Sequence, residues 1–157
     1  MSRLIRLMAS ASAAAAAVAM MAVPASADTP AASSGSGGFV VAVTSVRTAD
    51  GNTIVGLSFQ GTVSGTFTGT WSETGTEVMH PDGTVTTNAS GTFHVSVSGC
   101  GARTFEFSVA GQGVVNGSIS GQFRSIDEAS ATSAIHTVDA FQTTGPASFV
   151  YSGMYSC

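Results

Sequence analysis

The chain contains no lysine and few charged residues of either sign. Charged residues make up 9% of its 157 positions. Beyond residue 27 the only arginines are Arg47, Arg103 and Arg124, against nine Asp and Glu, so the formal charge of this segment is 3 − 9 = −6. A segment with this negative charge repels nucleic-acid phosphates and anionic membrane surfaces. We therefore expect no nucleic-acid partner.

Motifs that hold a metal or perform catalysis are also missing. The three histidines, His80, His94 and His136, do not have the spacing of zinc ligands. Serine, histidine and aspartate are present, but no Gly-x-Ser-x-Gly segment arranges them as in a hydrolase. The sequence therefore predicts no metal and no cofactor, and it identifies no catalytic residue.

Only one long apolar run occurs, from Leu7 to Val23. Arg3 and Arg6 precede it, and the small residues of Pro24-Ala25-Ser26-Ala27 follow it. This order is typical of a secretory signal peptide over residues 1–27, which predicts a secreted, extracellular protein. An uncleaved membrane anchor is the alternative. After residue 27 no apolar run approaches about 18 residues, so we expect no integral membrane segment after cleavage.

Cysteine is scarce as well, with Cys100 and Cys157 the only two. Export into an oxidising environment favours a disulfide between them. That bond would close a loop of 57 sequence steps and lower the entropy of the unfolded chain by an amount worth about 4 kcal/mol. A reactive thiol pair is the alternative, although the spacing is not that of a redox motif.

After residue 27 the sequence is rich in glycine, threonine, serine and β-branched residues, which alternate with apolar ones. Residues 28–38 are small and polar without apolar periodicity, which predicts a flexible leader. From residue 39 to residue 157 apolar residues recur with period two between short turns, as in β-strands. We predict eight strands and no helix, over residues 39–47, 53–60, 61–80, 84–98, 103–115, 118–126, 135–141 and 147–155.

Eight strands joined by short turns favour an all-β fold, an eight-stranded antiparallel up-and-down barrel. Closure removes the exposed strand edges that a flat sheet would leave. A β-sandwich would use the same alternation and is the alternative.

Four stretches together carry a resemblance to known proteins: residues 59–70 (FQGTVSGTFTGT), 117–123 (GSISGQF), 125–137 and 151–155 (YSGMY). They resemble proteins of the allene oxide cyclase barrel-like superfamily, which includes small exported bacterial proteins of unknown function. The resemblance implies a barrel whose lumen shapes a reactive apolar substrate, as in plant cyclases, dirigent proteins and bacterial polyketide cyclases. No catalytic residue of those proteins can be carried over to a matched position here.

Glu73 and Glu77 are candidate ligand-binding residues because they share the parity of Trp71, which is expected to point inward. A buried glutamate has a raised pKa and can act as an acid or a base. Four residues along a strand span roughly 13 Å, which is too far for a paired-carboxylate mechanism. A bulge near Gly75 that reverses the parity, or a position at the wet mouth of the barrel, is the alternative.

Tyr151 and Tyr155 are further candidates, since with Trp71 they could line one end of the lumen. Their alternative is a core position with the hydroxyl at the rim.

Three functions follow as hypotheses. The first is a secreted, non-enzymatic barrel that binds a small apolar ligand or has a structural role. The second, from the resemblance alone, is a cyclase or isomerase acting on an apolar substrate in the lumen. The third is an extracellular protein-binding or inhibitor module presenting loops such as residues 127–134.

Overall fold

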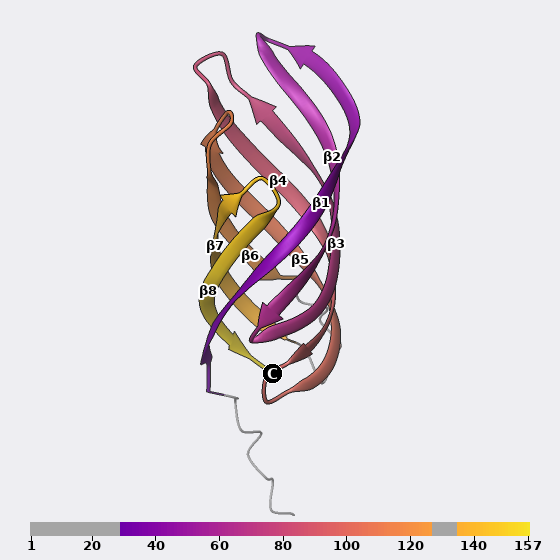
Figure 1. Ribbon diagram of the computed structural model, residues 1–157, viewed down its shortest axis with the longest axis vertical. Coiled ribbons are helices and arrows are strands. Elements are labelled where there is room, and N and C mark those ends of the chain that lie inside the picture. Colours follow the sequence, from indigo (N-terminus) through magenta and orange to yellow (C-terminus); the bar gives the residue numbers. More distant parts are fainter. Residues whose placement is uncertain (1–28, 127–134) are drawn as a thin grey trace, which may run out of the picture.

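The computed structural model describes residues 29–126 and 135–157, which form a closed antiparallel barrel of eight strands (Figure 1). Each strand pairs with its neighbour in sequence, and β1 pairs with β8. The strands are β1 (Ala31–Ala49), β2 (Asn52–Gly65), β3 (Phe67–Met79), β4 (Thr84–Val97), β5 (Gly101–Val114), β6 (Ile119–Ser125), β7 (His136–Gly145) and β8 (Ser148–Ser156). This topology confirms the up-and-down barrel and rules out the sandwich.

The first strand begins earlier than the sequence predicts. Most of the flexible leader expected over residues 28–38 is strand, because β1 starts at Ala31. Residues 31–38 pair with β8, from Ala31 opposite Tyr155 to Gly38 opposite Ser148. These small side chains carry no apolar periodicity, but their backbone groups supply the ladder that closes the barrel.

The boundary between the second and third strands also differs from the prediction. Gly61 was expected to open the third strand, yet it lies inside β2 and pairs with Trp71 of β3. The chain turns instead after Gly65, whose φ of 109° is a conformation that a residue with a Cβ rarely adopts. The turn is held by a hydrogen bond of 2.9 Å from the Thr66 amide to the Ser34 carbonyl of β1.

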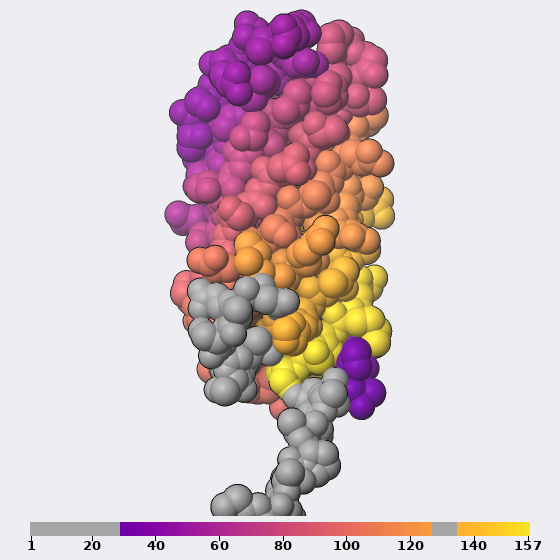
Figure 2. Space-filling view, turned by 180° about the vertical axis from the view of Figure 1, so that it is seen from behind, coloured from indigo at the N-terminus to yellow at the C-terminus, as the bar shows by residue number. Residues whose placement is uncertain are grey.

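The two ends of the barrel are built differently. Four hairpins lie at the upper end in Figure 1, and the hairpin of β1 and β2 rises well beyond that of β7 and β8. The upper rim is therefore oblique. The opposite end, called the base here, holds the start of β1 and the C-terminus. Seen from behind, the strands wind obliquely around an elongated body (Figure 2).

Aromatic side chains fill the interior near the base. Phe67 is 0% exposed. Its ring contacts five others with centroid distances of 5.6 to 6.4 Å: Phe93, Phe105, Phe123, Tyr151 and Tyr155. Edge-to-face and tilted contacts of this kind stabilise a core beyond the area that they bury. The base is therefore a packed aromatic plug.

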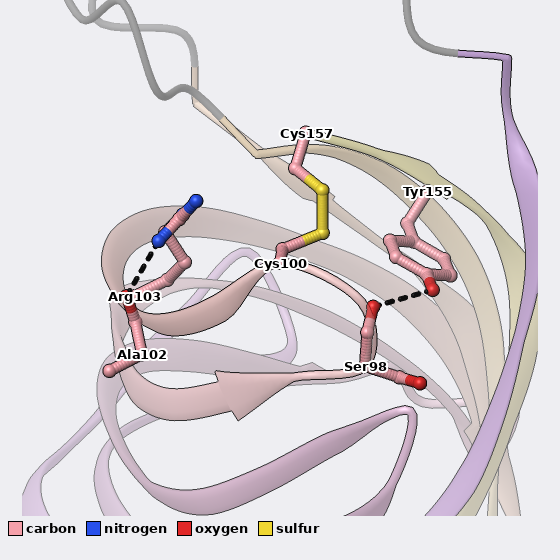
Figure 3. Close-up of a disulfide and its surroundings, with 6 residues drawn as sticks. All are labelled: Ser98, Cys100, Ala102, Arg103, Tyr155 and Cys157. Carbon is pink, nitrogen blue, oxygen red and sulfur yellow. Dashed lines mark hydrogen bonds between the residues drawn. A yellow bond between two sulfur atoms is a disulfide. The ribbon is translucent and has the colours of Figure 1, made fainter.

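A disulfide fastens the C-terminus to this plug (Figure 3). Cys100 and Cys157 are bonded, with Cα atoms 6.2 Å apart, as the sequence predicted. Beside the bond, the Tyr155 hydroxyl donates a hydrogen bond of 2.8 Å to the Ser98 carbonyl. Both links join β8 to the turn between β4 and β5.

Two segments lie outside the described residues, namely 1–28 and 127–134. The predicted signal peptide over residues 1–27 falls in the first of them. Within the part of the chain that the structure describes, no helix is long and apolar enough to cross a membrane.

Replacing both cysteines by serine should destabilise the barrel by about 4 kcal/mol, since the unfolded chain regains the entropy of a 57-step loop. Urea unfolding of C100S/C157S and of the native protein, followed by far-ultraviolet circular dichroism, measures the difference. An unchanged midpoint would show that the bond adds no constraint to the unfolded chain.

Candidate ligand cavity in the upper half of the barrel

Above the aromatic plug the barrel contains a cavity of about 330 Å³ that is partly open to solvent. Its walls come from all eight strands and from the turns at the lower side of the oblique rim, and they are mostly aromatic or aliphatic. The lining residues are Phe39, Val41, Val43, Leu57, Phe59, Trp71, Glu73, Glu77, Thr87, Phe93, Phe107, Val109, Gly117, Ile119, Phe123, Phe141, Thr143, Gly145, Pro146 and Phe149. The interior is thus packed at one end and hollow at the other.

Strand β3 supplies the three predicted site residues that line this cavity, namely Trp71, Glu73 and Glu77. Their parity is kept because β3 pairs without interruption with both β2 and β4. The alternative of a bulge near Gly75 is therefore wrong: Gly75 keeps its register between Leu57 and Ala89.

The aromatic wall is organised around Trp71, which is buried. Its ring lies 5.8 Å from that of Phe149 and 6.2 Å from that of Phe39, both at steep angles. Gly61, opposite on β2, leaves room for the indole, since a Cβ there would lie 2.8 Å from Trp71 Nε1. That nitrogen has no hydrogen-bond partner in the described part of the chain, so packing alone positions the ring.

Glu73 lies deeper in the cavity than Glu77, which is nearer the rim. On the neighbouring strands, Phe59 and Gly91 lie opposite Glu73. Burial raises the pKa of Glu73 to about 7 because the apolar surroundings disfavour the charged form. Burial raises the pKa of Glu77 as well. Among described residues no hydrogen bond or cation offsets this effect at either group.

The lining contains no positive charge. Of its members only Glu73 and Glu77 are titratable, and none is an arginine or histidine. Over residues 29–126 and 135–157, no group of three or more His, Cys, Asp or Glu side chains is placed to hold a metal ion. The cavity is thus an apolar space with two carboxylates that lack a counter-charge.

The two candidate tyrosines lie below the cavity rather than in its wall. Tyr151 is buried in the plug, where its hydroxyl accepts a hydrogen bond of 3.1 Å from the Phe67 amide and donates one of 3.4 Å to the Ser64 carbonyl. Burial is the main reason that the pKa of Tyr151 is raised. Tyr155 is tied to Ser98 at the base. Both therefore complete the plug, in the core position given as their alternative above. The Tyr155 hydroxyl lies at the end of the barrel as that alternative has it, whereas the Tyr151 hydroxyl is buried inside.

A buried carboxylate in the lower half escaped the sequence analysis. Asp139 of β7 is 0% exposed and accepts hydrogen bonds from the hydroxyls of Ser33 and Thr137. Burial raises its pKa, and these two hydrogen bonds partly oppose the rise. Its parity with Phe141 could have revealed it. Asp139 is outside the cavity, and its bond to Ser33 links the first residues of β1 to β7.

Comparison with known proteins adds no family to this description. No protein-family model matches the chain, and a search of curated proteins finds no match. The loop over residues 127–134, proposed for partner binding, lies outside the described residues. The cavity therefore carries the functional argument.

Replacing Glu73 by Gln should stabilise the protein at pH 8 but not at pH 4. With a folded pKa of about 7, above the ordinary 4.5, Glu73 costs nothing below pH 4.5, where both states are protonated. As pH rises from 4.5 to 7 the unfolded state ionises first, and native stability falls. The free energy of unfolding of E73Q, compared with that of the native protein, should therefore be higher at pH 8 than at pH 4 by an amount on the order of 2 to 3 kcal/mol.

Urea unfolding at both pH values tests this expectation, with Glu106→Gln as a control because Glu106 is exposed on β5. Equal pH dependence in E73Q and the native protein would show that Glu73 is not desolvated.

Proposed function

We propose that this protein binds a small apolar molecule in the upper half of its barrel. The observation that carries the proposal is the cavity of about 330 Å³ with walls of Phe, Trp, Val, Leu and Ile. Cavities of this size and composition are typical of small-molecule sites, although this one is at the small end of their range. A barrel of eight strands has an interior that side chains can fill completely, so an unfilled upper half needs a reason.

The plug limits access to one route. Phe93 and Phe123 contact Phe67 and also line the cavity, so they form its floor. A ligand would enter on the low side of the rim, past Gly145 at the end of β7 and past Gly117 and Pro146 in the adjoining turns. The absence of large side chains at Gly117 and Gly145 leaves this side open.

We also propose that the protein acts outside the cell after cleavage behind Ala27. The residues before that point have the order of a signal peptide, and a disulfide suits an oxidising compartment. Cleavage there would leave three residues before β1 at Ala31, so every backbone pair that closes the barrel would be kept.

Mass spectrometry of the secreted protein should find Asp28 as its first residue. Retention of residues 1–27 would contradict the proposal.

A second candidate, a cyclase or isomerase, is favoured by Glu73 alone. A carboxyl group with a pKa of about 7 in an apolar cavity can both donate and accept a proton near neutral pH. If the protein is such an enzyme, a bound cyclic ketone or enone should take up deuterium from D₂O, and this exchange should depend on Glu73. NMR measures the exchange. Ligand binding without deuterium exchange would support a binding protein and contradict the enzyme.

Filling the cavity should abolish binding. Trp71 is the only tryptophan and lies in the cavity wall, so its fluorescence reports occupancy directly. Val109→Phe adds a ring to the cavity, whereas Ala110→Phe adds one to the exposed outer face of the same strand. We expect small aromatic hydrocarbons to change Trp71 emission saturably in the native protein and in A110F, with at least about tenfold weaker binding in V109F.

No saturable change with any member of a size-graded series would contradict ligand binding. Equal affinity in V109F and A110F would place the binding site elsewhere.

A further inference from the structure

The wall around Glu73 combines a carboxylate with several aromatic side chains. On the same face of β3 the next inward residue is Trp71, and directly across on β2 is Phe59. Phe59 contacts Phe39 at a centroid distance of 5.7 Å, and Phe39 contacts Trp71. Side chains directly opposite in antiparallel strands have Cβ atoms about 4.5 to 5.5 Å apart. The Glu73 side chain therefore extends from the cavity wall beside aromatic rings.

This arrangement suits a cation more than any other chemical group. Aromatic faces attract a positive charge through the negative side of the ring quadrupole, most strongly for Trp and when the cation is desolvated. A carboxylate within a few Å adds Coulomb attraction, which the apolar walls strengthen by excluding part of the surrounding water. A purely hydrocarbon ligand would use the rings but leave the carboxylate buried and unpaired, at a cost in free energy.

Nothing in the described chain supplies that cation. The cavity lining has no Arg or His, and the sequence has no Lys. Of the three arginines beyond residue 27, Arg47 and Arg124 are exposed, and Arg103 donates to the Ala102 carbonyl at the base of the barrel. Glu77, the other carboxylate in the wall, adds negative potential to the cavity.

We infer that the ligand is an apolar molecule bearing one positively charged nitrogen, held between the Glu73 carboxylate and the rings of Trp71 and Phe59. The inference rests on the proposed function, because it names the chemical class of ligand for the same cavity. The apolar part of the ligand fills the space towards Phe149 and Val109, and the cation neutralises Glu73. A primary amine and a quaternary ammonium share this chemistry.

Two probes of nearly identical shape separate charge from shape. Benzyltrimethylammonium carries a fixed positive charge, and neopentylbenzene is its uncharged carbon isostere. At pH 8 we expect the ammonium to bind about tenfold more tightly than the isostere, as measured by Trp71 fluorescence and isothermal titration calorimetry. Glu73→Gln should abolish that preference, while Glu106→Gln on the outer surface should retain it.

The pH dependence in the native protein provides a test that needs no variant. The charge of the ammonium is fixed, and Glu73 and Glu77 are the titratable groups that face the cavity. Since the pKa of Glu73 is about 7, the ammonium should bind about tenfold more weakly at pH 6 than at pH 8. Binding at pH 7 should release protons, seen as a dependence of the heat on the ionisation enthalpy of the buffer.

The outcomes separate the two proposals. If the uncharged isostere binds as tightly as the ammonium, or if E73Q keeps the preference, the inference fails and the apolar cavity stands. Tighter binding at pH 6 than at pH 8 would also overturn it, because protonated Glu73 would then be the binding form. If neither probe binds, the inference fails, and the size-graded hydrocarbon series then decides whether the proposed function stands.

Discussion

The packing of five aromatic rings around Phe67 is the interaction on which the rest of the structure depends. Without it, an eight-stranded barrel with many inward glycines would have no continuous core near its base. With it, the lower half is solid, Tyr151 has a fixed position for its two hydrogen bonds, and the disulfide has a rigid turn to hold. The cavity above has a floor only because Phe93 and Phe123 belong to both layers.

The scarcity of charge explains the electrostatics of the upper half. Because no lysine is present and no arginine lines the cavity, desolvation acts on Glu73 without opposition. A desolvated carboxylate destabilises the folded state above pH 4.5. Proteins retain such costs mainly at functional sites. The same desolvation that weakens the free protein would strengthen its attraction for a cation that enters the cavity.

The fold could be predicted from the sequence because period-two alternation, turn residues and β-branched side chains agree over nearly the whole domain. The inward parity of Trp71, Glu73 and Glu77 followed from the same alternation, once no bulge interrupted β3. The strand over residues 31–38 was missed because pairing with β8, and no local signal, forms it. Gly61 was mistaken for a strand boundary because glycine marks both turns and places where a large ring needs room.

The level in the barrel at which Tyr151, Tyr155 and Asp139 lie could not be predicted, for a different reason. Parity alone indicates that a side chain points inward, but the tilt and stagger of the strands decide which side chains meet at one level. Phe67 and Tyr151 meet in the plug although 84 residues separate them. Asp139 is buried with Ser33, which is 106 residues away. Which side chains meet at one level is therefore decided only when the barrel closes.

The most direct test of this account is a measurement of the pKa of Glu73 by carboxyl-¹³C NMR, with and without saturating benzyltrimethylammonium. E73Q assigns the resonance. The account predicts a midpoint near pH 7 in the free protein and a clear fall when the cation is bound. A midpoint near 4.5 in the free protein would show a solvated carboxylate, and a midpoint unchanged by the ammonium would show that no cation lies beside it.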